Sequence, residues 1–304
     1  MKKYLPVLSV LGLFLVLVLY SGPAAAGARH GLEVCAATLV PSLLPFFVLS
    51  NLLSMLGLAD LLGGLFGGAM ARLFRTSPAG AQALFLGLSG GYPLGASVVA
   101  DLRRQGRVSR EEAERLLAFC NNSGPAFILG AAGGVLKSPQ AGAMLYLTHV
   151  LAAITVGVLM RPSGLPQSGQ AAPVTPPLPF GKALTAAVTR AVNSTLMVCG
   201  YVVLFGALLG FLTPLATLPP LWQSAVSGIL ELGSGIAALT GMTPTPAVLA
   251  AAAFLLGWGG LSVHCQTMGV LADTDIKCAR HLAGRALCGL LAAVYTLIGA
   301  LLIF

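Results

Sequence analysis

The sequence predicts an all-α polytopic membrane protein, and three observations support this fold class. Hydrophobic residues make up 57% of the 304 positions and charged residues only 9%, whereas a soluble domain carries about 25% charged residues. The mean hydropathy is +0.90. Long apolar runs recur along the chain between short charged or Pro-rich stretches, as expected of successive membrane helices. We therefore expect a multi-pass protein of a cell membrane.

The net charge of +8 at pH 7 is better explained by a membrane than by nucleic acid. In membrane proteins Lys and Arg concentrate in cytoplasmic loops and near lipid headgroups, and no basic patch here is interleaved with aromatic residues. We expect membrane lipids as partners and no nucleic acid. The six cysteines occur singly, without a C-x-x-C pair, so the sequence predicts no disulfide framework, no metal site and no cofactor.

Residues 1–30 predict an N-terminal transmembrane helix. Lys2 and Lys3 precede an apolar stretch over residues 5–20, which places the N-terminus in the cytoplasm. The alternative is a secretory signal peptide that is cleaved after the small residues at 24–26. We favour the uncleaved helix because many further apolar runs follow.

The next apolar run covers residues 34–58 and contains Pro41 and Pro45. Prolines inside a helix remove a hydrogen bond and clash with the preceding turn, so this run is expected to be kinked or split. A glycine-rich amphiphilic stretch over residues 61–71 follows. It is too short to span a membrane.

Residues 80–102 look like one membrane helix that is interrupted in its middle. The polar candidates at the interruption are Ser89, Gly90, Gly91 and Tyr92. The arms on either side have about ten residues each and cover roughly 15 Å, half of the hydrocarbon thickness. We therefore predict a re-entrant hairpin, which keeps the arginine-rich loop 101–115 on the cytoplasmic side together with Arg72 and Arg75.

A second polar interruption lies within residues 119–127. Ser109 and Glu112 form a capping box that starts the helix before it. The candidates at the interruption are Asn121, Asn122 and Ser123. Two explanations stay open: these side chains satisfy carbonyls freed by Pro125, or they contact a ligand or coupling ion. An ordinary membrane helix over residues 146–160 follows.

A Pro-rich linker over residues 161–180 separates two halves of the chain. In the second half, residues 181–304, the sequence predicts helices over 183–212, 221–239 and 282–304. A third polar interruption lies within 254–266. The candidate site residues of this half are Asn193, Ser194, Ser262, His264 and Gln266.

The two halves resemble each other, because residues 85–91 align with residues 255–261 and a charged turn follows each segment. We therefore predict two gate-type repeats, residues 31–160 and 181–304, each with a re-entrant hairpin.

The expected directions of the long helices favour inverted repeats, with a site at the repeat interface. One observation opposes inversion. It places Lys277, Arg280 and Arg285 on the outer side, against the positive-inside tendency.

Polar interruptions at membrane depth predict a transporter that moves a small solute by alternating access. Helix ends there present unpaired N–H groups, which suit an anionic or polar solute. His264 can carry a proton near neutral pH, and Glu231 is an acid within an apolar segment. A coupling ion, H⁺ or Na⁺, and a homo-oligomeric state are left open.

Two other classes of function are an enzyme with a nucleophilic serine and a scaffold or receptor that does not transport. Residues 87–91 match G-x-S-x-G, the pattern around a nucleophilic serine, but a nucleophile needs an aligned base. Neither His149 nor His264 sits in a recognisable partner motif, so we do not expect an enzyme. A non-transporting scaffold or receptor remains the further alternative.

The chain resembles the sporulation integral membrane proteins of the YlbJ type, which carry the nucleoside-recognition or gate domain. Four segments support the resemblance: LVPSLLPF at residues 39–46, SGGYPLGA at 89–96, FCNNSGPAF at 119–127 and GWGGLSVHCQ at 257–266. The resemblance covers nearly the whole chain. It implies a gate architecture similar to that of concentrative nucleoside transporters.

The same resemblance implies a function in endospore formation, in a bacterial cell membrane. The family is implicated in moving dipicolinic acid, a small aromatic dianion, across the outer forespore membrane. The alternatives are a nucleoside or another small solute, as in a relative from an organism that does not sporulate.

Overall fold

A computed structural model describes residues 4–163, 178–212 and 217–303. Within these ranges the regular structure is helical, without a strand, in agreement with the predicted all-α class. Residues 164–177, most of the predicted Pro-rich linker, lie outside the described ranges. One buried core joins both halves of the chain and extends from Phe47 to Ala300.

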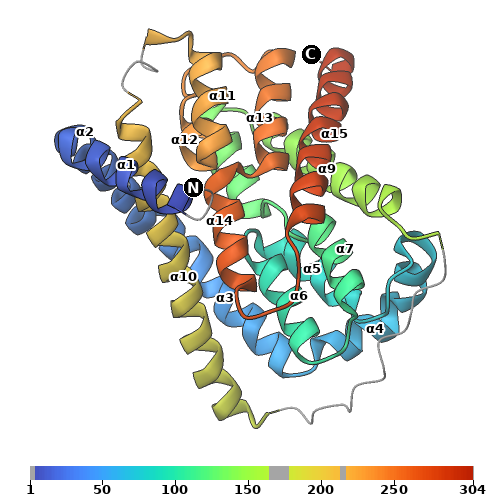
Figure 1. Ribbon diagram of the computed structural model, residues 1–304. Helices are drawn as coiled ribbons and strands as arrows, with labels where there is room; N and C mark the ends of the chain where they lie inside the picture. The colour runs from blue at the N-terminus through green and yellow to red at the C-terminus, as the bar shows by residue number, and fades with distance from the viewer. Residues whose placement is uncertain (1–3, 164–177, 213–216, 304) are drawn as a thin grey trace.

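The N-terminal third forms two bent helix pairs (Figure 1). Helix α1 (Leu5–Leu19) meets α2 (Ser21–Val34) at 96°. After the π-helix η2 (Cys35–Leu39), helix α3 (Val40–Met55) carries Pro45 in its interior. Its continuation into α4 (Leu58–Ala69) and η3 (Met70–Phe74) is bent by 81°. This bend follows Met55, so it lies beyond Pro41 and Pro45, where the sequence predicts a kink or split.

The predicted hairpin at residues 80–102 is present. Helices α5 (Gly80–Gly90) and α6 (Leu94–Arg104) pack side by side in opposite directions (Figure 1). They are joined by residues 91–93, which we call the hairpin turn. Gly91 adopts φ +85° and ψ −175° there, a conformation that is essentially restricted to glycine.

Helix α7 (Arg110–Cys120) starts as the sequence predicts, because the Ser109 hydroxyl accepts the backbone N–H of Glu112. It ends at a non-helical segment, residues 121–124, which we call the Asn turn. The chain then continues through η4 (Ala126–Ala132), α8 (Gly133–Val135) and α9 (Pro139–Leu159). Helix α9 is longer than the predicted helix over 146–160.

The second half contains the long helix α10 (Phe180–Gly210) and the short helices α11 (Pro220–Leu230) and α12 (Leu232–Ala237). Helices α13 (Pro246–Trp258) and α14 (Gly260–Leu271) follow, and α15 (Ala279–Ile303) closes the chain. In the described part, four helices are long and apolar enough to cross a membrane, or up to six if each bent pair counts as one span. The protein is a multi-pass membrane protein.

The predicted second re-entrant hairpin, at residues 254–266, is wrong. Helices α13 and α14 together form one candidate span, residues 246–271, interrupted only at Gly259 and Gly260. Both glycines have positive φ angles, +90° and +82°, which shift the helix locally without reversing the chain. The helix after the interruption therefore leads away from α13 (Figure 1).

This path brings the two charged turns of the chain together. Arg103 forms an ion pair of 2.8 Å with Asp275, and Arg104 one of 2.6 Å with Asp273. The hydrogen bonds from these guanidinium groups lower the pKa of both aspartates. Lys277 and Arg280 follow directly, so they lie at the same end as the loop after α6.

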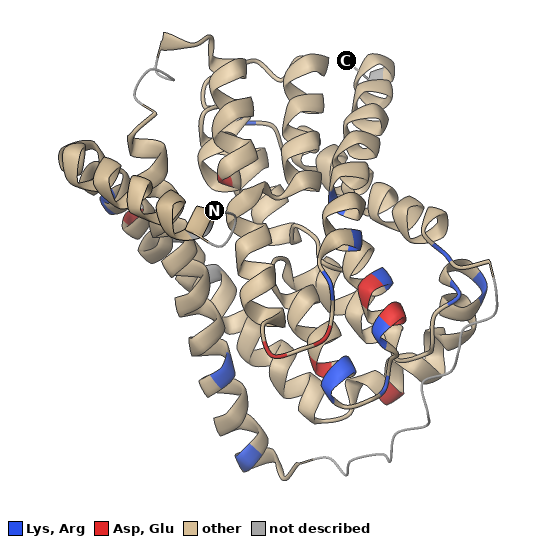
Figure 2. Ribbon diagram, viewed as in Figure 1, with Lys and Arg blue, Asp and Glu red and all other residues tan. Residues whose placement is uncertain are grey.

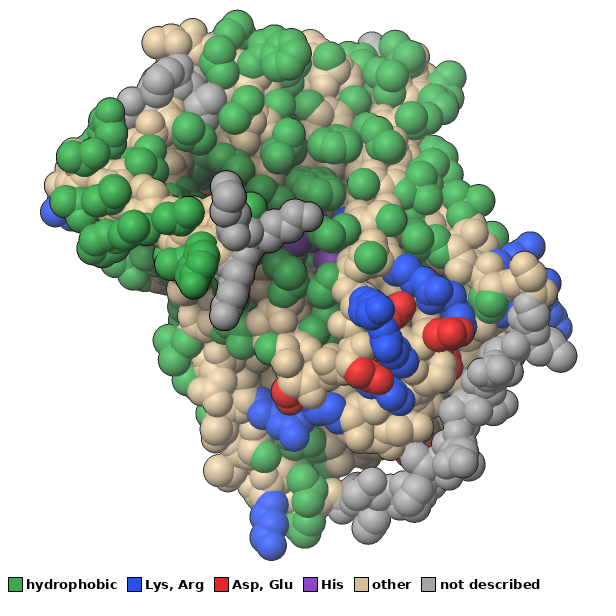
Figure 3. Space-filling model, in the orientation of Figure 1, with side chains coloured by type: hydrophobic (Ala, Val, Ile, Leu, Met, Phe, Trp, Pro, Cys, Tyr) green, Lys and Arg blue, Asp and Glu red, His purple; other side chains and the backbone are tan. Residues whose placement is uncertain are grey.

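Most charged residues gather in the half of the molecule that holds these turns (Figure 2), while apolar side chains cover much of the other half (Figure 3). This distribution agrees with the positive-inside rule. Lys277 and Arg280 therefore lie at the charged end, and not at the outer side where the inverted plan placed them. The inverted relation of the two halves is not confirmed. Arg285 does not belong to this surface at all, because its side chain is buried inside the protein.

Cysteine labelling tests this topology. Gln105→Cys and Lys277→Cys, each in a background where only the introduced cysteine reacts, are expected to react with an impermeant maleimide from the same side of the membrane. Thr240→Cys, between α12 and α13, is expected to react from the opposite side. Labelling of positions 105 and 277 from opposite sides would contradict the arrangement and restore the inverted plan.

Candidate functional site

A cavity of about 440 Å³ lies where several interruptions of the helices meet. Its wall contains the end of α5, the hairpin turn, the Asn turn, η4, the start of α12 and one face of α14, together with residues of α2, η2, α3 and α10. Pockets for small molecules have volumes of about 300–1,000 Å³. The lining residues are Val34, Leu39, Leu43, Phe46, Ser89, Gly90, Gly91, Tyr92, Ser123, Gly124, Ala126, Phe127, Gly130, Ala131, Val198, Val202, Glu231, Leu232, Gly233, Val263 and Gln266.

The polar side chains of this wall are few, and most already have a partner within the protein. The Ser89 hydroxyl donates to the carbonyl oxygen of Phe85 at 2.8 Å, and that of Ser123 donates to the carbonyl of Leu256 at 3.0 Å. The Gln266 amide donates to Ser262 at 3.2 Å. A mostly apolar wall with a few fixed polar groups is typical of a site for a small organic solute.

Glu231 supplies the carboxylate of the cavity wall. It lies between α11 and α12, where its two oxygens accept the backbone N–H groups of Gly233 at 3.0 Å and Ser234 at 2.6 Å. Two hydrogen bonds from helix-start N–H groups suit an ionised carboxylate. The predicted continuous segment over 221–239 is therefore interrupted at its acidic residue, which caps the second piece.

Arg285 of α15 lies directly behind this wall and is completely buried. Its guanidinium donates to the Asn122 side-chain oxygen at 2.8 Å and to the Gly257 carbonyl oxygen. Its Cζ lies 5.5 Å from the centre of the Tyr92 ring, within the range of a cation–π contact. One side chain thus contacts the hairpin turn, the Asn turn and the end of α13.

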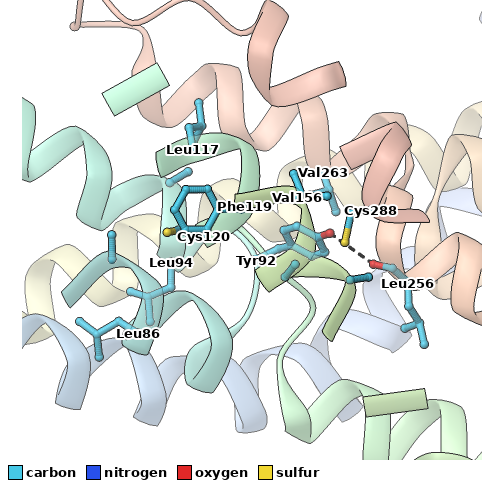
Figure 4. Packing of buried hydrophobic residues seen from close by; sticks show 14 of the residues in the cluster. Leu86, Tyr92, Leu94, Leu117, Phe119, Cys120, Val156, Leu256, Val263 and Cys288 are labelled. Carbon is cyan, nitrogen blue, oxygen red and sulfur yellow. Dashed lines mark hydrogen bonds between the residues drawn. The ribbon is translucent and has the colours of Figure 1, made fainter. Parts of the chain in front are cut away.

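Tyr92 separates the guanidinium from the cavity. Its ring packs in the core beside Val263 and Cys288 (Figure 4), and its hydroxyl donates to the carbonyl of Leu256 at 3.3 Å. Tyr92 also lines the cavity. Between the charge of Arg285 and the cavity there is therefore one layer of side chains.

The two asparagines of the Asn turn do not line the cavity, although both are fully buried. Asn121 accepts from the backbone N–H of Ala96 at 3.2 Å and donates to the Thr267 hydroxyl at 3.0 Å, which links the hairpin to α14. Asn122 donates to the Phe119 carbonyl at 2.7 Å and accepts from Arg285. Both side chains thus satisfy buried polar groups of the protein.

The buried histidines also lie behind the cavity wall. His264 Nδ1 is 3.2 Å from His281 Nε2, and His281 Nδ1 is 3.2 Å from the Leu117 carbonyl. A carbonyl requires a donor, so neutral His281 carries its proton on Nδ1 and accepts from His264. His149 Nε2 accepts the backbone N–H of Ser123 at 3.2 Å. Each of the three is thereby engaged in packing the Asn turn or its neighbours.

Of the predicted site residues, six line the cavity: Ser89, Gly90, Gly91, Tyr92, Ser123 and Gln266. Asn121, Asn122, Ser262 and His264 lie buried behind its wall. Asn193 is exposed and Ser194 half-buried, and neither lines the cavity.

Sequence reasoning did not predict that Arg285 is buried behind the cavity wall. The signal was present, since it is a cation within the apolar run that becomes α15. Among the described residues, no group of three His, Cys, Asp or Glu side chains is placed to hold a metal ion.

Comparison with known proteins identifies a relative that matches almost the entire chain. The sporulation integral membrane protein YlbJ of Bacillus subtilis (strain 168) is 32% identical over 332 aligned positions, which cover 94% of this chain and 80% of the relative. No protein-family model matches the chain, and no solved structure does. With this identity over nearly its full length, the chain belongs to the family of sporulation integral membrane proteins of the YlbJ type.

Proposed function

We propose that this protein carries a small anionic aromatic solute, dipicolinic acid, across the outer forespore membrane during endospore formation. The observation that supports transport best is the position of the cavity. It is lined by the hairpin turn, the Asn turn and the start of α12, and non-helical backbone at membrane depth is tolerated where it lines a cavity or is buried in protein. Secondary transporters bind their solutes at such interrupted helices.

The relative contributes the biological setting of the proposal. Its name places it in the membrane and in sporulation. A cavity of about 440 Å³ has room for one small aromatic acid, and its aliphatic and aromatic lining suits a flat ring. H⁺ or Na⁺ as the coupling ion belongs to the same proposal.

The wall of the cavity favours transport over hydrolysis. The Ser89 hydroxyl, the nucleophile that a hydrolase would need, donates to the carbonyl of Phe85. His149 contacts the backbone of Ser123, and His264 contacts His281. No histidine is thus hydrogen-bonded to Ser89 in the described part of the chain.

Uptake into liposomes tests the proposal. Purified protein is expected to accelerate uptake of labelled dipicolinate, with uridine as the competing solute class. Uptake of uridine alone would favour the nucleoside alternative. Absence of uptake of both solutes by correctly folded protein would favour a scaffold or receptor.

A matched pair of variants tests the cavity itself. Gly130 lines the cavity, and a Cβ atom there meets no other atom within 4 Å. Gly130→Phe is therefore expected to fill the cavity and lower the uptake rate by at least about tenfold, equivalent to roughly 1.4 kcal/mol. Gly134 is equally free of neighbours but does not line the cavity, so Gly134→Phe should transport like the wild type. Equal uptake by both variants would argue against this cavity as the path.

A further inference from the structure

Arg285 contacts the hairpin turn, the Asn turn and the end of α13, and it has no anionic partner among the described residues. We propose that its charge makes the cavity selective for anions, so that Arg285 is the residue that determines which charge the solute must carry. This inference rests on the proposed function and adds to it the residue that selects the charge of the solute.

The charge of Arg285 is not neutralised within the protein. Its hydrogen bonds go to a side-chain amide oxygen and a backbone carbonyl oxygen, the Tyr92 and Cys288 side chains lie beside it, and its Nε has no hydrogen-bond partner. In the part of the chain that the structure describes, no carboxylate lies within ion-pair distance of it. An isolated charge is costly to bury, and ionisable residues at membrane depth commonly serve a function.

Glu231 does not cancel this charge. It lies on the cavity wall, but both of its oxygens accept backbone N–H groups at the start of α12. Each of the two charges is hydrogen-bonded to neutral groups, and among the described residues no ion pair joins Glu231 to Arg285. The two charges therefore act on the cavity separately, and we expect the carboxylate of a solute to lie toward Arg285 and away from Glu231.

The guanidinium acts on the cavity through one layer of side chains. Tyr92 touches the cavity on one side and stacks near Arg285 on the other. Ser123 lines the cavity next to Asn122, which binds Arg285. At an effective dielectric constant of about 20, a unit charge at an assumed separation of roughly 8 Å changes the affinity for a monovalent anion by about 30-fold. We take this as the order of magnitude expected across one layer of side chains. No movement of Arg285 is needed for this effect.

The rest of the lining determines the shape of the expected solute. Much of the remaining lining is formed by apolar residues such as Leu39, Phe46 and Val198. A solute that places a carboxylate toward Tyr92 and an apolar ring toward these residues matches both parts. The geometry therefore points to an aromatic carboxylate.

Binding to the purified full-length chain tests the inference with two probes of the same shape. Pyridine-2,6-dicarboxylate carries two charges, and its diamide carries none. The wild type is expected to prefer the dianion. Arg285→Gln should lose about 30-fold or more of this preference while keeping its affinity for the diamide. Arg285→Lys should retain the preference, because it keeps the charge.

A second pair of variants leaves Arg285 in place. The Cys288 thiol lies beside the guanidinium. Cys288→Asp places a carboxylate there and is expected to abolish the preference for the dianion, while the uncharged Cys288→Ser is expected to keep it. This pair decides the question even if Arg285→Gln fails to fold.

The outcomes separate the inference from the proposed function. A wild type that prefers the dianion, with Arg285→Gln or Cys288→Asp preferring it equally, overturns the role of Arg285 and leaves transport standing. A wild type that binds dianion and diamide equally overturns anion selectivity. A wild type that binds neither probe contradicts the proposed solute, and the inference fails with it.

Discussion

Replacing Gly87 with alanine is expected to prevent the hairpin of α5 and α6 from packing against α7. A Cβ atom at Gly87 would lie 1.6 Å from the carbonyl oxygen of Cys120, and one at Gly95 would lie 2.1 Å from the same oxygen. The contact is with backbone rather than with the far end of a flexible side chain, so the backbone of α5 or α7 must shift to accept the new atom. Overpacking a core costs about 3 kcal/mol or more when backbone must shift.

Thermal unfolding of the purified protein measures this effect. Gly87→Ala is expected to unfold at a much lower temperature than the wild type, or to aggregate during purification. Gly64→Ala in α4 is the control, since a Cβ there meets nothing within 4 Å and alanine favours a helix over glycine by up to about 1 kcal/mol. If both variants unfold like the wild type, the close approach of α5 to α7 is wrong.

Local sequence predicted the elements of this fold better than their directions. A Gly-Gly pair lies at the hairpin, as Gly90 and Gly91, and another at the α13–α14 interruption, as Gly259 and Gly260, yet only the first reverses the chain. Pro93 follows the first pair and stops the helix, while the second pair is followed directly by the residues of α14. The ion pairs of Asp273 and Asp275 stabilise the second path, and such contacts between distant turns cannot be derived from either segment alone.

The position of Arg285 shows the same limit. The sequence predicts a last helix over 282–304, in which Arg285 lies near the charged start. Helix α15 starts at Ala279, so Arg285 lies six residues, or roughly 9 Å, inside it. That shift moves a residue from the expected outer surface into the core. Only the packing of α15 against α7 and α13 reveals the change.

The exposure of Asn193 could be predicted from the sequence. The buried face of α10 repeats at Ala187, Ala191, Thr195 and Val198, the spacing of one helix face. Asn193 lies two residues from both Ala191 and Thr195, which places it on the opposite face. Helical periodicity applied to this segment predicts that exposure, and the structure has Asn193 outside the cavity lining.

Asn122→Ala is expected to destabilise the protein and abolish transport. The change removes the acceptor of one Arg285 N–H and the donor to the Phe119 carbonyl, and all three residues are almost completely buried. A lost hydrogen bond to a charged group costs about 1.5–3 kcal/mol, and an unpaired buried carbonyl adds about 1–3 kcal/mol. Together these terms predict a loss of roughly 3–5 kcal/mol in the free energy of unfolding.

Three further variants show whether the effect of Asn122→Ala comes from its hydrogen bond to Arg285 or from a general loss of packing. They are Asn193→Ala, Arg285→Met and the double variant Asn122→Ala/Arg285→Met, each measured in unfolding and uptake assays. Asn193→Ala changes an exposed asparagine of the same protein and is expected to behave like the wild type, within about 0.5 kcal/mol. In Arg285→Met the charge that needs Asn122 is gone. If the guanidinium is the reason for the loss, adding Asn122→Ala to Arg285→Met should cost at least about 1 kcal/mol less than adding it to the wild type. Equal costs in the two backgrounds would show that Asn122 acts on the chain independently of Arg285.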